Sequence, residues 1–115
     1  MSLSIKTRKE DGVNVLELSG RLTIGESVLS LRDAVRSAVD DGELKFVLNL
    51  GDVSYIDSSG LGELVSIYTT VRNKKGDVKL LKLTAKAKDL LQMTKLLTVF
   101  DTFDEEADAL AALKG

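Results

Sequence analysis

Asp57-Ser58-Ser59-Gly60-Leu61-Gly62 is the stretch that decides how this chain is built. A mainly apolar run that begins at Phe46 precedes it, and apolar residues at helical spacing follow it. A strand that turns directly into a helix leaves free backbone N–H groups at the helix start, which favour an oxygen acceptor or an anion. The two hydroxyls therefore have two interpretations. Either Ser58 or Ser59 caps the helix, or a hydroxyl is presented for modification while the glycines allow another backbone to approach closely.

Upstream of this stretch, alternating apolar residues predict two antiparallel strands, from Leu3 to Lys9 and from Val13 to Ser19. Asp11-Gly12 between them is a strong signal for a two-residue hairpin. We expect Gly20 to end the second strand. The sequence thus begins with a β-hairpin.

The rest of the chain alternates between helical and strand patterns. Thr23-Ile24-Gly25-Glu26 matches a capping box with Thr23 as the cap, and Gly42 is placed to end the helix that follows. The expected elements after it are a buried strand Lys45 to Leu50, a helix from Leu61 to about Asn73, a strand Val78 to Leu83, a helix capped by Thr84, a short strand Leu97 to Phe100, and a final helix opened by Asp104 with Ala107, Leu110, Ala111 and Leu113 inward.

The resulting order, ββαβαβαβα, predicts an α/β fold with a mostly parallel sheet, an N-terminal hairpin and packed helices. The 115 residues, 43% of them hydrophobic and 30% charged, suit one domain that spans residues 1–115. We see no run that approaches the roughly 18–20 apolar residues of a membrane span and no signal peptide, so a cytoplasmic location without membrane contact is the expectation.

Composition excludes several kinds of chemistry. The formal charge of −2 provides no basic footprint for nucleic acid. The chain contains no His and no Cys, which removes the commonest metal ligand and general base as well as any thiolate nucleophile. Gly60-Leu61-Gly62 lacks the third glycine of a dinucleotide fingerprint, and Ser59 has no G-x-S-x-G context. We expect a protein that is not an enzyme and that holds no metal or cofactor.

Tyr55-Ile56 together with the Asp57 to Gly62 motif resembles the signature of STAS domains, the anti-sigma factor antagonists of bacterial partner-switching systems. Leu18-Ser19-Gly20-Arg21-Leu22 resembles the early turn of that family, and the order of patterns from Leu3 to Leu113 fits one complete domain. The resemblance supports the α/β fold a second time. It also implies that the second serine of the motif, Ser59, accepts a phosphate from a partner kinase.

The resemblance further implies the partners and the surface. The unphosphorylated domain would bind an anti-sigma factor with a histidine-kinase-like serine kinase fold, free the sigma factor, and release its partner once Ser59 is phosphorylated; a phosphatase would reverse this. The implied partner-binding residues are Thr23, Asp57, Ser58, Ser59, Gly60, Leu61 and Gly62.

Two positions depart from the family pattern. Thr23 stands where many members have an Asp on the kinase-facing surface, and Asn49 replaces a frequent Asp. Both leave the identity of the kinase open, and Thr23 is a candidate second phosphoacceptor, although capping is the interpretation we favour.

Two other interpretations remain, and a third is disfavoured. STAS domains also serve as small subunits of lipid-transport ABC complexes, and a phosphate-inert scaffold would use its serines only as caps. Asp57 at a strand end is similar to the phosphoacceptor of receiver domains, but those need an acidic pair after the first strand and a late Lys-Pro, and this chain has no Pro.

Overall fold

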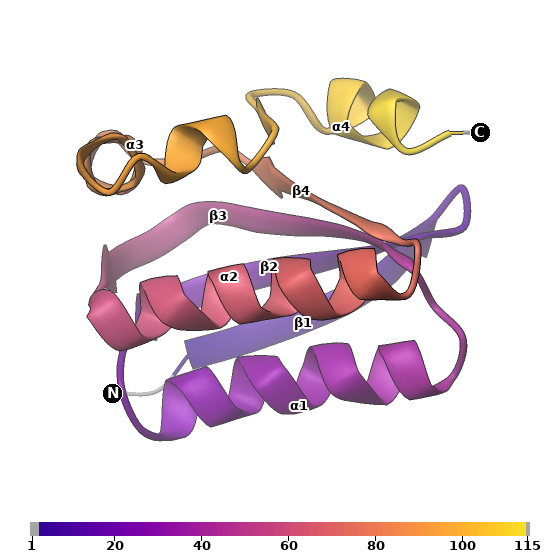
Figure 1. The fold of residues 1–115 in the computed structure, drawn as a ribbon, viewed down its shortest axis with the longest axis horizontal. Coiled ribbons are helices and arrows are strands. Elements are labelled where there is room, and N and C mark those ends of the chain that lie inside the picture. The colour runs from indigo at the N-terminus through magenta and orange to yellow at the C-terminus, as the bar shows by residue number, and fades with distance from the viewer. Residues whose placement is uncertain (1–2, 115) are drawn as a thin grey trace.

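The computed structural model describes residues 3–114, which form a five-stranded sheet with helices on both faces (Figure 1). The strands lie in chain order, with β1 antiparallel to β2 and all other neighbours parallel. The elements are β1 (Leu3–Glu10), β2 (Val13–Leu22), α1 (Glu26–Asp40), β3 (Lys45–Ile56), α2 (Ser58–Asn73), β4 (Asp77–Leu81), α3 (Ala85–Met93), the short 3₁₀ helix η1 (Leu96–Thr98), β5 (Thr102–Phe103) and α4 (Glu106–Ala112). The predicted fold class is confirmed.

The predicted hairpin is present between β1 and β2. Asp11 and Gly12 both have positive φ, 53° and 80°, which is the conformation of a type I′ turn. Gly20, however, does not end β2, because the strand continues to Leu22. Its φ of 115° coincides with a register shift between Gly20 and Arg21 in the pairing of β2 with β3. This glycine therefore forms a bulge within the strand.

The alternation of side chains along the strands supplies two cores. On one face, Leu16, Leu48 and Leu80 pack with α1 and α2, and Leu91 of α3 joins the same cluster. On the other face the smaller cluster consists of Val13, Val15, Val47, Leu81, Ala109 and Leu113, so that α4 covers it. Figure 1 shows α1 and α2 side by side and beginning at the same end of the molecule. That end carries the predicted site.

The last predicted strand differs from the structure. Leu97 to Phe100 is not a strand: its first two residues belong to η1, and Phe100 packs edge-on against Tyr68 with ring centroids 5.2 Å apart. The last strand is β5, two residues further on. This run has the aromatic and β-branched residues that are typical of a strand, but tertiary packing decides its conformation.

The inward face of α4 was also predicted wrongly. Ala107 and Ala111 are exposed, whereas Ala109 and Leu113 are buried and Leu110 is half-buried. The helix begins at Glu106 rather than at Asp104. In an alanine-rich helix the apolar stripe is too poorly defined for its position to be read from the pattern.

Within residues 3–114 no helix is long and apolar enough to cross a membrane. The same residues contain no group of three or more His, Cys, Asp or Glu side chains arranged to hold a metal ion.

Candidate functional site

Asp57, and neither serine, caps α2. Its Oδ1 atom accepts a hydrogen bond from the backbone N–H of Gly60 at 2.8 Å, and its carbonyl accepts from Leu61. The prediction that Ser58 or Ser59 caps the helix is therefore wrong. Asp is as good a cap as Ser, and the helix begins one turn earlier than the apolar pattern suggested, at Ser58 instead of Leu61.

The second oxygen of Asp57 reaches the loop between β2 and α1. Oδ2 accepts a hydrogen bond from the backbone N–H of Ile24 at 2.9 Å. The hydrogen bonds from Ile24 and Gly60 lower the pKa of the Asp57 carboxyl below its usual value. One carboxylate thus ties two separate segments of the site together.

The start of α1 is not a capping box. Gly25 occupies the cap position with no side-chain hydrogen bond. Instead Ser27, which is buried, accepts from the Thr23 N–H at 2.8 Å and donates to the Thr23 carbonyl at 2.7 Å. The prediction for Thr23 and Glu26 is wrong, because Ser27, one residue beyond the motif, accepts from the Thr23 N–H in place of Glu26. Thr23 itself is half-buried in this loop.

Gly60 is required by the approach of α2 to β2. A Cβ atom at this position would lie 2.2 Å from the Leu22 carbonyl oxygen and 2.9 Å from Leu22 Cγ. At Gly62, by contrast, no other segment of residues 3–114 comes within 4 Å of the position of a Cβ. Gly60 therefore allows α2 to pack closely against β2, whereas Gly62 leaves the exposed surface of α2 without a side chain at that position.

The remaining residues of the motif divide between core and surface. Leu61 is buried in the core with Gly60, while Ser58 and Gly62 are exposed and Ser59 is half-buried. Ser59 and Gly62 line a shallow depression of about 450 Å³. The other lining residues come from α1, from the loop before it and from the next turns of α2: Ile24, Gly25, Val28, Leu29, Arg32, Glu63 and Ser66.

Two apolar residues beside the serines were not anticipated from the sequence. Ile24 is 76% exposed and Leu29 is 51% exposed, both on the rim of this depression. On the other side of the motif Tyr55 is 48% exposed, and the Arg21 guanidinium lies 5.1 Å from the centre of its ring. No periodic pattern marks Ile24, because it stands in a loop.

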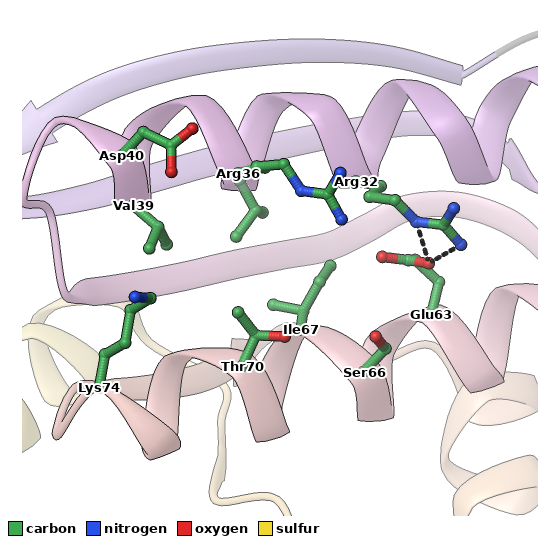
Figure 2. A pocket seen from close by; sticks show the side chains of 10 residues that line it. Arg32, Arg36, Val39, Asp40, Glu63, Ser66, Ile67, Thr70 and Lys74 are labelled. Carbon is green, nitrogen blue, oxygen red and sulfur yellow. Dashed lines mark hydrogen bonds and ion pairs between the residues drawn. The ribbon is translucent and has the colours of Figure 1, made fainter.

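An ion pair between α1 and α2 also lies at the site. Arg32 Nε and Nη2 donate to Glu63 Oε1 at 3.1 and 2.8 Å, and Figure 2 shows the two side chains pointing at one another across the groove between the helices. The Glu63 side chain is only 3% exposed, and these hydrogen bonds raise the pKa of Arg32. An acid on the buried face of α2, among Gly60, Leu64 and Ile67, was the signal in the sequence that a cation must face it.

This architecture and site define a known class. The STAS domain model matches residues 4–109, and the chain belongs to the STAS domain family.

Within that family, the anti-sigma F factor antagonist of Paenibacillus polymyxa is 29% identical over 119 residues, which cover 99% of this chain and 97% of that protein. A Thermotoga maritima protein described as a candidate anti-sigma factor antagonist superposes with a TM-score of 0.89 at 25% identity, over 95% of this chain and 93% of its own. The phosphorylated form of Bacillus SpoIIAA superposes with a TM-score of 0.77 at 19% identity, over 96% of this chain and 100% of its own, and so shares the fold.

Proposed function

We propose that the protein is an anti-sigma factor antagonist whose binding is controlled by phosphorylation of Ser59. In the unmodified form it binds an anti-sigma factor with a histidine-kinase-like serine kinase fold, so that a sigma factor is set free. Phosphorylation of Ser59 by that partner ends the complex, and a phosphatase restores it. The domain, which we take to span residues 1–115, acts in the cytoplasm by binding and not as an enzyme.

The position of the Ser59 hydroxyl is the observation that carries this proposal. The capping role belongs to Asp57, and the Ser59 side chain has no hydrogen-bond partner within residues 3–114. It is half-buried at the rim of a depression, at the positive end of a helix of 16 residues. A hydroxyl that makes no hydrogen bond within the described residues and lies where an anion is favoured suits a phosphoacceptor.

The proposed docking surface consists of Thr23, Ile24, Leu29, Ser58, Ser59 and Gly62. Ile24 and Leu29 supply exposed apolar area, and Ser59 lines the same depression. Gly62 allows a partner backbone to approach α2, since no other part of the described chain fills the space that a Cβ would take there. The start of α2 is held in place below this surface by three residues, Asp57, Gly60 and Leu61.

A phosphate on Ser59 should affect the binding of the partner far more than the stability of the fold. A phosphate adds about 1.5–2 negative charges at neutral pH, and a helix N-terminus favours such a charge by roughly 0.3–2 kcal/mol. The folded domain therefore tolerates it. Burying an unpaired charge in an interface costs several kcal/mol, and each 1.4 kcal/mol is about tenfold in affinity. The modified domain should lose its partner without unfolding.

The experiment pairs the protein with purified kinase-type anti-sigma factors from the same organism, with ADP or with ATP, and maps the phosphopeptides. One phosphate on Ser59 is expected. The Ser59→Ala variant should still bind in ADP but no longer dissociate in ATP, and the matched Ser58→Ala variant should behave as the wild type does. Phosphate confined to Ser58 or Thr23, or a complex indifferent to ATP, would contradict the proposal.

A further inference from the structure

Arg32 lies in the same depression as Ser59 but on a different helix. Ser59 and Glu63 are four residues apart on α2, so their side chains occupy the same face one turn apart. Arg32 reaches across from α1 and donates two hydrogen bonds to one oxygen of Glu63. The Arg32 guanidinium is thereby anchored on the residue one helical turn after Ser59, in the depression that both line.

The ion pair uses only part of the hydrogen-bonding capacity of Arg32. A guanidinium has five N–H donors in a fixed plane, and two of them point to Glu63 Oε1. The other three have no acceptor within residues 3–114, and the Arg32 side chain is 42% exposed. Arg32 can therefore hold Glu63 and bind a second anion at the same time.

We propose that Arg32 is the internal cation for phosphorylated Ser59: it bridges the Glu63 carboxylate and the phosphate. This inference rests on the proposed modification of Ser59 and adds the residue that receives it. Arg–phosphate pairs are commonly bidentate, and a phosphate extends the side chain beyond the hydroxyl toward α1. Glu63 fixes the orientation of the guanidinium beforehand, so that little side-chain freedom is lost when the phosphate arrives.

The bridge has a consequence for the docking surface. Without Arg32, the phosphate would stand between two carboxylates, Asp57 at the helix start and Glu63 one turn on. With it, the charge of Glu63 is compensated and the phosphate is held against the domain. The three remaining N–H donors of Arg32 are then occupied in the phosphorylated form and open to a partner only in the unmodified form.

The test installs phosphoserine at position 59 by codon suppression, so that no kinase is needed and a failure is distinct from failure of the proposed function. The pKa of the phosphate, ordinarily about 6, is measured by ³¹P NMR titration. It should be lower by roughly 0.5–1 pH unit in the otherwise wild-type domain than in Arg32→Gln, as expected for a cation at hydrogen-bonding distance in water. Besides Arg32, the charged groups at the phosphate are Asp57 and Glu63, which both variants retain.

Arg36→Gln is the matched control, because Arg36 is on the same helix and lines the neighbouring groove in Figure 2 but not the depression of Ser59. It should leave the phosphate pKa within about 0.2 units of the wild-type value, a shift expected of a more distant, screened charge.

A second measurement keeps the proposal testable if Arg32→Gln fails to fold. In the unsubstituted domain, the Nε–Hε resonance of Arg32 should shift on phosphorylation while that of Arg36 does not. Equal phosphate pKa values in the wild type and Arg32→Gln, an equal effect of Arg36→Gln, or an unmoved Arg32 resonance would each overturn the bridge.

Discussion

Asp57 Oδ2 accepts a hydrogen bond from the backbone N–H of Ile24 although 33 positions separate the two residues. The same carboxylate caps α2 through Gly60. The loop that carries the exposed Ile24 side chain and the helix that carries Ser59 are thus held in one arrangement by one ionised group.

This link should depend on pH. The folded protein lowers the pKa of Asp57, below the value of about 3.9 in an unfolded chain. The resulting stabilisation is therefore fully present above about pH 5 and is lost as the pH falls through the folded-state pKa.

Asp57→Asn tests this dependence. An amide keeps one oxygen as acceptor for Gly60, but its NH₂ group cannot accept from Ile24. The variant should be less stable than the wild type at pH 7, and the two should converge toward pH 3. Urea unfolding at intervals between these pH values checks it; a difference that stays constant with pH would contradict the role of the charge.

The two glycines of the motif should respond in opposite ways to alanine. Gly60→Ala places a methyl group 2.2 Å from the Leu22 carbonyl oxygen, and such overpacking costs roughly 1–3 kcal/mol or more. Gly62→Ala, in open space on an exposed helix position, should stabilise by roughly 0.5–1 kcal/mol. Thermal unfolding of both variants decides this, and equal effects would show that the contact with Leu22 is not what selects glycine.

Neither serine should matter much for stability. Since Asp57 is the cap, Ser58→Ala and Ser59→Ala should each change the free energy of unfolding by at most about 0.5 kcal/mol, as for ordinary surface positions. Denaturant unfolding at pH 7 measures this. A loss above about 1 kcal/mol for either variant would mean that its hydroxyl takes part in capping after all.

The exposed apolar residues should contribute to partner binding. Ile24→Ser and Leu29→Ser remove side chains that are 76% and 51% exposed, so they should leave the unfolding temperature nearly unchanged. Burial of such a side chain in an interface is worth roughly 1.5–3 kcal/mol, so each change should weaken binding about tenfold or more.

Met93→Ser is the control for these two variants, because Met93 is 81% exposed but lies on α3, away from the depression of Ser59. Calorimetric titration with the anti-sigma factor compares the three. If Ile24→Ser and Leu29→Ser both bind with wild-type affinity, these two residues are not part of the docking surface.

The fold was predictable because its signals are local and redundant. The Asp11-Gly12 turn, Gly42 after α1 and the Thr84 cap are confirmed, the last by a 3.1 Å bond from Ala87 N–H. Errors arose where a local pattern competed with tertiary contacts. Phe100 lies in a strand-like run, but its packing against Tyr68 places it after a 3₁₀ turn.

The site was predictable in its location but not in its contacts. Asp57, Ser58 and Ser59 do lie at the start of a helix. The sequence could not show that Asp57 reaches Ile24, or that Glu63 meets Arg32, since both contacts join segments about 30 positions apart. Such pairs depend on how α1 lies beside α2, which no periodicity encodes.

The two edge strands of the sheet determine whether copies of this chain can associate through their sheets. Unpaired strand edges invite further strands, and proteins avoid this with short or charged edges. At one border β5 offers only two residues, and at the other β1 carries Lys6, Arg8, Lys9 and Glu10 among its eight. Fibril-like stacking through the sheet is therefore disfavoured at both sides. Even at high concentration, copies of this chain should therefore not extend one another's sheets through these two edge strands.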